Sequence, residues 1–183
     1  IREDILMKRL LTLSMVLVIS AAVLTGCSGG NGSSSALNSV GTSVDGNEVA
    51  IEQASMKLVS AVQNGGYELI GTEELNAWVT EGKEMIIIDT MPADSYAKGR
   101  IPGALNAELP KTGMADVTAE QREAFTALLG DDKDVPVVVY CGFVACERSD
   151  VGAVIAKELG YNNVYRCPGG IVAWENAGYE AEK

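Results

Sequence analysis

Four apolar residues, Val137 to Tyr140, stand in an unbroken run immediately before a cysteine. A run of apolar residues that does not alternate with polar ones is typical of a strand that is covered on both faces, as happens in parallel sheets. Val151, Ile155 and Leu159 then follow at helical spacing. A buried strand, a loop and a helix in this order predict an α/β fold, in which ligands bind at the carboxyl ends of the parallel strands.

The rest of the chain alternates in the same way. The sequence predicts further strands at 67–70, 85–88 and 164–166. It also predicts three helices: one is capped by Thr72 and ends at Gly82, a second is capped by Thr118 and Gln121 and ends at Gly130, and a third lies around Trp174. Between 94 and 106, one proline and two glycines predict turns rather than regular structure. We therefore expect a single domain over residues 67–183, with a small parallel sheet flanked by helices.

Charge and composition exclude several classes of function. The 183 residues suit one domain with an appendage, and 47% of them are hydrophobic, which favours a packed core over disorder. The net charge of −11 would repel a phosphate backbone, so nucleic acid is not an expected partner. The chain contains no histidine, which removes the commonest general base and the commonest zinc ligand. We expect neither a metal nor an organic cofactor.

The N-terminal region carries the pattern of an export signal. Lys8 and Arg9 precede an apolar stretch from residue 10 to 24, and small residues follow, which predicts a signal peptide at 1–26 with Met7 as its expected start. Residues 24–27, Leu-Thr-Gly-Cys, resemble the lipobox of bacterial lipoproteins. The resemblance implies lipidation of Cys27 and a membrane-anchored protein that faces the periplasm or the cell exterior.

Two segments separate this signal from the main domain. Residues 27–47 are rich in Gly, Ser and Asn, a composition that predicts a flexible tether. Residues 48–66 place apolar side chains at helical spacing and end in Asn64, Gly65 and Gly66. We therefore expect a short amphipathic helix that packs against the domain.

The loop after the central strand holds the candidate functional residues. They are Cys141, Gly142, Phe143, Val144, Ala145, Cys146, Glu147, Arg148 and Ser149. Backbone amides in such a loop, together with a helix N-terminus and an arginine, stabilise a negatively charged sulfur and lower a thiol pKa from its free value of ~8.5. We therefore expect Cys141 to be ionised at neutral pH without a histidine. The alternative is a small buried residue that closes a strand.

Several motifs, taken in order, resemble the rhodanese-like domain family. They are Ile88-Asp89-Thr90, Gly99-Arg100-Ile101-Pro102-Gly103-Ala104, Val139-Tyr140-Cys141, Arg148-Ser149, and Pro168-Gly169-Gly170 with Trp174. The resemblance covers about residues 67–180. It implies a five-stranded sheet flanked by helices and a cysteine, Cys141 here, that carries sulfane sulfur as a persulfide. The sulfur would come from thiosulfate or a similar anionic donor and pass to a thiol or another nucleophile, with Arg148 binding the departing anion.

Three departures from the family pattern leave the substrate open. Met91 stands where the family commonly has an arginine, and Arg100 replaces the usual histidine before Ile-Pro-Gly. Six residues separate Cys141 from Arg148, whereas sulfurtransferases of the family usually have four and related phosphatases five. Cys146 stands where the arginine of the shorter loop would be.

Other functions remain open from the sequence. Cys146 and Cys167 are candidate resolving thiols, so Cys141 and Cys146 could cycle between thiols and a disulfide with a redox partner protein. The chain could also be a non-catalytic binding module with the rhodanese fold. An anion phosphatase or arsenate reductase would suit the enlarged loop, but the arginine spacing counts against it. With Cys27 lipidated, three thiols remain, and an odd number leaves at least one free or paired between molecules.

Overall fold

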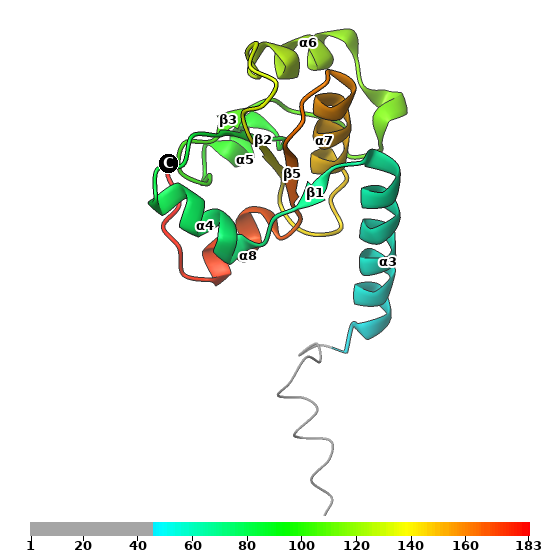
Figure 1. The fold of residues 1–183 in the computed structure, drawn as a ribbon. Coiled ribbons are helices and arrows are strands. Elements are labelled where there is room, and N and C mark those ends of the chain that lie inside the picture. Colours follow the sequence, from blue (N-terminus) through cyan, green and yellow to red (C-terminus); the bar gives the residue numbers. More distant parts are fainter. Residues whose placement is uncertain (1–45) are drawn as a thin grey trace, which may run out of the picture. The chain divides into compact units, whose positions relative to one another are not determined.

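Five short parallel strands form the centre of the fold (Figure 1), and the computed structural model describes residues 46–183. The strands are β1 (Glu68–Leu69), β2 (Ile86–Asp89), β3 (Leu105–Asn106), β4 (Val137–Tyr140) and β5 (Val164–Cys167), in the order β1-β5-β4-β2-β3. Tyr140 of β4 lies opposite Asp89 of β2 on one side and Cys167 of β5 on the other. The carboxyl ends of the three central strands therefore meet at one edge. The predicted α/β fold with a small parallel sheet is confirmed.

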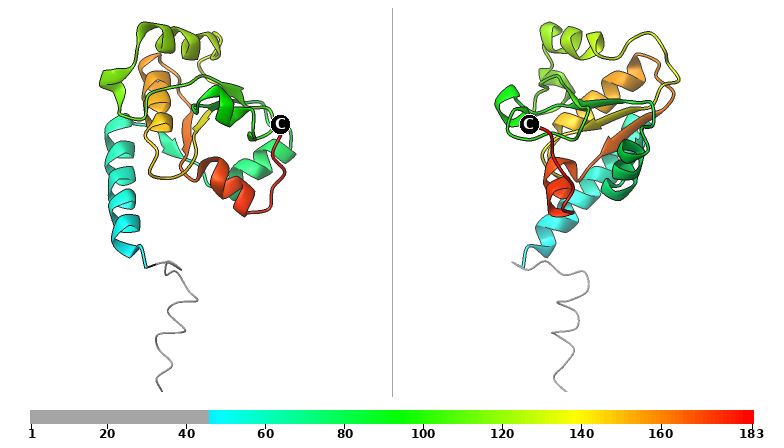
Figure 2. Two further views of the ribbon diagram at one scale, coloured as in Figure 1. Left: turned by 180° about the vertical axis from the view of Figure 1, so that it is seen from behind. Right: turned by 90° about the vertical axis from the view of Figure 1, so that its left-hand side faces the viewer.

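Helices cover both faces of this sheet (Figure 2). They are α4 (Thr72–Thr80), α5 (Ala93–Tyr96), α6 (Ala119–Ala127), α7 (Arg148–Glu158) and α8 (Gly170–Asn176), with α3 (Glu48–Gly65) ahead of the sheet in the chain. Val137 and Val139 pack in a core shared with α6 and α7, whereas Val138 and Tyr140 pack in a second core shared with α4 and α8. Alternate side chains of β4 thus enter two cores, and the strand is buried on both faces, as its unbroken apolar run predicts.

Local predictions are confirmed at α6 and wrong at two other places. The capping box of Thr118 and Gln121 forms at the start of α6. Thr72 does not cap α4, because Gly71 holds that position and Thr72 is the first helical residue. In the segment 94–106 the predicted turn forms at Pro102 and Gly103, where the N–H of Ala104 donates to the Ile101 carbonyl at 3.0 Å. The rest of the segment is not made of turns alone, since most of α5 and the whole of β3 lie within it. An edge strand of two residues is too short to show an alternating pattern in sequence.

The helix α3 occupies the stretch where the sequence predicts an amphipathic helix (Figure 1). Its side chains at Ala54, Leu58, Ala61 and Val62 are half-buried, and Val62 packs against the core shared with α7. Among residues 46–183, no helix is both long and apolar enough to cross a membrane. The predicted signal peptide, Cys27 and nearly all of the predicted tether lie outside the described residues.

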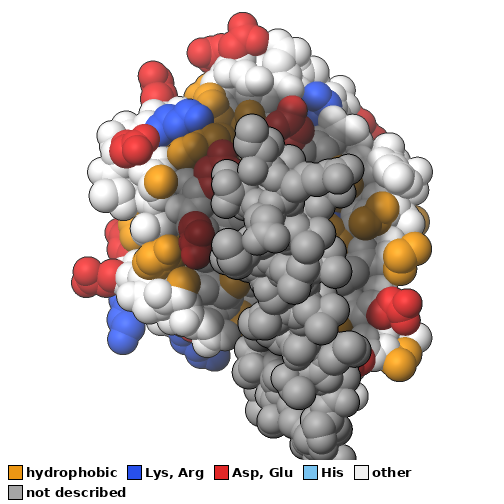
Figure 3. Space-filling view, turned by 60° about the horizontal axis from the view of Figure 1, so that its bottom comes forward, with side chains coloured by type: hydrophobic (Ala, Val, Ile, Leu, Met, Phe, Trp, Pro, Cys, Tyr) orange, Lys and Arg blue, Asp and Glu red, His pale blue; other side chains and the backbone are white. Residues whose placement is uncertain are grey.

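The surface of the described domain carries charges of both signs. On the face shown in Figure 3, basic side chains are dispersed among acidic and hydrophobic ones. They do not form one continuous basic patch on that face. This distribution agrees with a chain whose acidic residues outnumber its basic residues by 25 to 14.

Candidate active site

The loop between β4 and α7 lies at the carboxyl edge of the sheet, and Cys141 is its first residue. Cys141 is 1% exposed. Its Sγ atom lies 3.8 Å from the carbonyl oxygen of Phe143, 3.5 Å from that of Cys146 and 3.4 Å from the hydroxyl oxygen of Ser149. The loop therefore encloses the Cys141 sulfur in polar groups of its own backbone and side chains.

The pKa values of Cys141 and Cys146 are shifted in opposite directions. The interaction with the Cys141 thiol is the main reason why the pKa of Cys146 falls to about 6. The backbone N–H groups of Arg148 and Gly142 and the Arg148 guanidinium lower that pKa further, against the effect of burial. The two shifts together favour a thiolate on Cys146 over one on Cys141 at neutral pH.

The expected ionisation of Cys141 at neutral pH is therefore wrong for the reduced loop. The interaction with Cys146, together with burial, raises the pKa of the Cys141 thiol well above its ordinary value, although donors from Ser149 oppose this rise. The amides of Gly142 and Arg148 donate to the Cys146 sulfur. The sequence predicts a loop that stabilises a thiolate, but it assigns that thiolate to the wrong sulfur of the pair.

A cavity of about 470 Å³ opens on the outer side of the loop. Its lining residues are Lys57, Met91, Pro92, Lys111, Gly142, Phe143, Ala145, Cys146, Glu147 and Arg148. Cys146 is part of this lining and Cys141 is not. Three of the lining side chains are basic and one is acidic, so the cavity suits a small anion.

The basic residues of the cavity come from three separate parts of the chain. Lys57 projects from α3 and forms an ion pair with Glu147 in the loop. Arg148 begins α7, donates a hydrogen bond to the Leu109 carbonyl and lies 3.6 Å from a carboxylate oxygen of Glu108. Lys111 follows β3 in the chain. These side chains supply positive charge beside Met91, where the family commonly has an arginine.

A buried arginine supports the loop from its inner side. The side chain of Arg166 in β5 is 4% exposed, and it donates hydrogen bonds to the Cys146 carbonyl at 2.9 Å and to the Ser149 hydroxyl at 3.0 Å. A guanidinium can only donate, so the Ser149 oxygen accepts from Arg166 and its own proton is free to point at the Cys141 sulfur. Arg166 thereby positions the group that faces Cys141.

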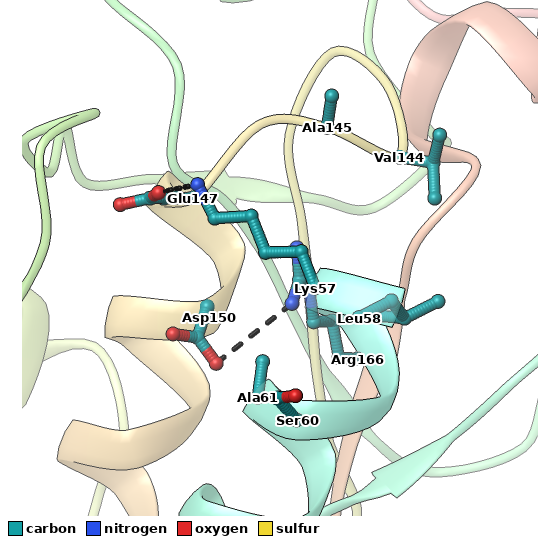
Figure 4. A pocket seen from close by; sticks show the side chains of 9 residues that line it. All are labelled: Lys57, Leu58, Ser60, Ala61, Val144, Ala145, Glu147, Asp150 and Arg166. Carbon is teal, nitrogen blue, oxygen red and sulfur yellow. Dashed lines mark hydrogen bonds and ion pairs between the residues drawn. The ribbon is translucent and has the colours of Figure 1, made fainter. Parts of the chain in front are cut away.

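The same arginine is also held by Asp150 of α7 (Figure 4) and by Tyr67, which lies between α3 and β1. Arg166 lies 3.7 Å from a carboxylate oxygen of Asp150 and donates to the Tyr67 hydroxyl at 3.2 Å, and that hydroxyl donates to Asp150. Burial and the Asp150 carboxylate raise the pKa of Tyr67 to about 12, so its hydroxyl stays protonated. Lys57 reaches from α3 toward Glu147 across the neighbouring cavity of about 270 Å³.

The glycine turn after β5 is tied to the start of the reactive loop. The N–H of Ile171 donates to the Cys141 carbonyl at 3.0 Å, and the N–H of Val172 donates to the Gly142 carbonyl at 3.1 Å. Gly170 has a φ of +57°, and a Cβ atom added there would lie 2.0 Å from the Cys141 carbonyl oxygen. Glycine is required here because both the backbone conformation and the close approach exclude a side chain.

Cys167 ends β5 and is also 1% exposed. It packs in the core shared with α4 and α8, and burial raises the pKa of its thiol, although the N–H groups of Gly170 and Gly169 and the Thr72 hydroxyl oppose this rise. In the described part of the chain, no hydrogen bond joins Cys167 to either loop sulfur. The structure thus brings Cys146 to Cys141, but it places Cys167 in a hydrophobic core.

Sequence reasoning missed three cations of the site, Lys57, Lys111 and Arg166. The first two carry no readable signal, because only the folded chain brings them to the loop. Arg166 does have a recognisable sequence signal, since a charged residue inside an otherwise apolar strand indicates a buried, paired charge. Within residues 46–183, no group of three or more His, Cys, Asp or Glu side chains could hold a metal ion.

Comparisons with known proteins agree with this fold. The sequence model of the family described as "Rhodanese-like domain" matches residues 71–177. The fold is similar to that of a thiosulfate sulfurtransferase from Pseudomonas aeruginosa, with a TM-score of 0.54 and 22% sequence identity. That likeness covers 70% of this chain and 22% of the other.

Two curated relatives are similar in sequence. An HTH-type transcriptional regulator from Mycobacterium tuberculosis is 31% identical over 103 residues, which are 56% of this chain and 40% of that protein. A tRNA uridine(34) hydroxylase from Erwinia tasmaniensis is 31% identical over 102 residues, which are 55% of this chain and 26% of that protein. The chain therefore spans less than half the length of each of these relatives.

Proposed function

The chain belongs to the rhodanese-like domain family, and from this premise we propose that it is a sulfurtransferase. It takes sulfane sulfur from a small anionic donor such as thiosulfate and holds it as a persulfide in the loop that starts at Cys141. It then passes the sulfur to a thiol or another nucleophile. Cys141 stands at the persulfide position that the family resemblance implies, and Cys146 lies against it.

The observation that supports this proposal is a loop thiol with a lowered pKa, Cys146, beside a cation-lined cavity. A thiolate is the nucleophile that sulfur transfer requires, and it must exist at neutral pH. Lys57, Lys111 and Arg148 surround a space in which an anionic donor and its anionic leaving group are both favoured. The loop amides that now face the Cys146 sulfur would also stabilise a persulfide anion.

The two relatives described above are named for tRNA hydroxylation and transcriptional regulation. The chain spans only 26 to 40% of those two proteins. Its net charge of −11 disfavours a nucleic-acid partner. A small anionic sulfur donor and a thiol acceptor fit the cavity better.

Thiol–disulfide exchange is a second candidate function, because one specific contact favours it. The Cys141 sulfur lies 3.5 Å from the carbonyl oxygen of Cys146, so the loop brings the two residues that would form a disulfide close together. Such a protein would exchange electrons with a dithiol partner protein and would need no sulfur donor.

We also propose that the protein acts outside the cytoplasm, anchored by a lipid on Cys27. The support is the lipobox resemblance at residues 24–27 and the preceding apolar stretch. Growth with a labelled fatty acid tests this proposal, and the label should be absent from a Cys27→Ser variant. Equal labelling of both proteins would reject the anchor without affecting the sulfurtransferase proposal.

The enzymatic proposal is tested by turnover of the purified domain. Thiosulfate is supplied with cyanide or a small thiol as the acceptor, and sulfite and thiocyanate or sulfide are measured. The wild-type protein should turn over, and the double variant Cys141→Ser with Cys146→Ser should not. Cys167→Ser is the matched control, because it changes a thiol outside the loop. A wild-type protein that releases no more sulfite than the double variant would reject the assignment.

A further inference from the structure

The two loop sulfurs differ in position and charge, which indicates different tasks. We propose that Cys146 attacks the sulfur donor and that Cys141 then resolves the resulting persulfide, which releases hydrosulfide and leaves a disulfide between Cys141 and Cys146. This inference rests on the proposed sulfur-transfer function. It adds a reductive release of sulfide, for which the two loop thiols supply the electrons.

The first task falls to Cys146 because it is the sulfur that a donor can reach. Cys146 lines the cavity of about 470 Å³ together with Lys57, Lys111 and Arg148, whereas Cys141 is 1% exposed and absent from that lining. The N–H groups of Gly142 and Arg148 both donate to the Cys146 sulfur. A donor anion that enters the cavity therefore meets the charged sulfur first.

The second task falls to Cys141 because of what surrounds it. Its Sγ atom lies 3.5 Å from the carbonyl oxygen of Cys146, so the loop folds the residue that would be its disulfide partner back against it. The Ser149 hydroxyl lies 3.4 Å from the Cys141 sulfur and is positioned by Arg166 at 3.0 Å. This hydroxyl can stabilise the negative charge that develops on Cys141 as its proton leaves.

The two steps balance without an external oxidant or reductant. In the first, the Cys146 thiolate attacks the sulfane sulfur of thiosulfate, the sulfur–sulfur bond of the donor breaks, and sulfite leaves with the electron pair. In the second, the Cys141 sulfur attacks the inner sulfur of the persulfide, which is the Sγ atom of Cys146. The bond to the outer sulfur breaks, and that sulfur leaves as hydrosulfide with the former Cys141 proton. Two thiols are oxidised to a disulfide, and one sulfane sulfur is reduced to sulfide.

The test is a single turnover of the fully reduced protein under anaerobic conditions with thiosulfate and no acceptor. Sulfite and sulfide are measured together with the mass of the peptide that contains both loop cysteines. The wild-type protein should release one equivalent of each product, and its peptide should become lighter by two hydrogen atoms. The Cys141→Ser variant should release sulfite but no sulfide, and the added sulfur atom should stay on Cys146.

Two further variants complete the test. Cys146→Ser should release sulfite about tenfold more slowly than the wild type at pH 7, because only the buried, protonated thiol of Cys141 remains. Cys167→Ser should behave like the wild type. The division of tasks is overturned if Cys146→Ser releases sulfite at the wild-type rate, or if the wild-type protein keeps a stable persulfide and releases no sulfide. Failure of the sulfurtransferase proposal looks different, since then no protein in the series releases sulfite.

Discussion

Two cysteines close neighbouring parallel strands in this fold, and they share burial and a raised thiol pKa but differ in their surroundings. Cys141 follows β4 and Cys167 ends β5, and each is 1% exposed. The Cys141 sulfur lies 3.5 Å from the carbonyl oxygen of a second cysteine, Cys146, which lines a cavity together with three basic side chains. Cys167 packs in a hydrophobic core, and burial raises the pKa of its thiol.

The difference originates in the segment that follows each cysteine. Six residues, 142–147, separate Cys141 from the start of α7, whereas only 168 and 169 separate Cys167 from the start of α8. The longer loop can fold Cys146 back over Cys141 and leave room for a cavity, but the shorter turn cannot. A cysteine at a strand end before a helix is therefore not sufficient for a reactive thiol. The loop must also place charged groups near the thiol and leave a cavity through which a substrate can reach it.

The strongest contrast between the two strand ends should appear in sulfurtransferase turnover. Replacing Cys141 and Cys146 together by alanine should reduce turnover by about a thousandfold or more, because no nucleophile remains in the loop. Cys167→Ala should keep turnover within about twofold of the wild type, although it removes packing atoms from a core and should cost about 1 kcal/mol in stability. A comparable loss in both proteins would break the comparison.

The second prediction concerns the turn after β5 as a scaffold for the loop after β4. Gly170→Ala should lower the free energy of unfolding by about 3 kcal/mol, because the new Cβ meets the Cys141 carbonyl and the residue has a positive φ. Gly82→Ala is the matched control, since it has a φ of +67° with nothing within 4 Å, and it should cost only about 1 kcal/mol. Chemical denaturation measures both values, and equal losses would show that the close approach does not matter.

Alkylation of the thiols as a function of pH should separate Cys146 from Cys167. The thiolate is the reactive form, so the rate for Cys146 should rise with pH, reach half its maximum near pH 6 and level off above it. Cys167 should remain unmodified across this range in the folded protein. The charged groups that face the cavity around Cys146 are Lys57, Lys111, Glu147 and Arg148.

A matched variant identifies why Cys146 alkylation reaches half its maximum rate at such a low pH. Cys141→Ala removes the interaction that is the main reason for the lowered pKa of Cys146. The midpoint of Cys146 alkylation should therefore move upward by about one pH unit. An unchanged midpoint would mean that the loop amides and Arg148 alone determine it.

The smallest effect is expected at the rim of the cavity. Lys57→Ala should raise KM for thiosulfate about two- to threefold with little change in kcat, because Lys57 adds positive charge but is exposed and paired with Glu147. The increase should shrink at high salt, since screening weakens exposed charges. Lys98→Ala removes the same charge from an exposed position outside the cavity lining, and it should leave KM unchanged. A larger effect for Lys98 would argue against a local role of Lys57.

Much of the fold could be predicted because it depends on local patterns. The apolar run at β4 requires cover on both faces, and the structure places alternate side chains of that run in two cores. The capping box at Thr118 and Gln121 involves residues three positions apart, so the sequence alone predicts it. The edge strand β3 could not be predicted, since its two residues are ordered by pairing with β2 rather than by their own pattern.

By itself, the sequence determined where the reactive loop lies, because a buried strand, a cysteine-containing loop and an amphipathic helix are each encoded within a few neighbouring residues. Only the tertiary structure decided which sulfur carries the charge and which cations face it. The opposite pKa shifts of Cys141 and Cys146 depend on how the loop folds back on itself, and Lys57 and Arg166 reach the loop from α3 and β5. The physical reason is that ionisation responds to charges and donors within a few ångströms in space, whatever their separation along the chain.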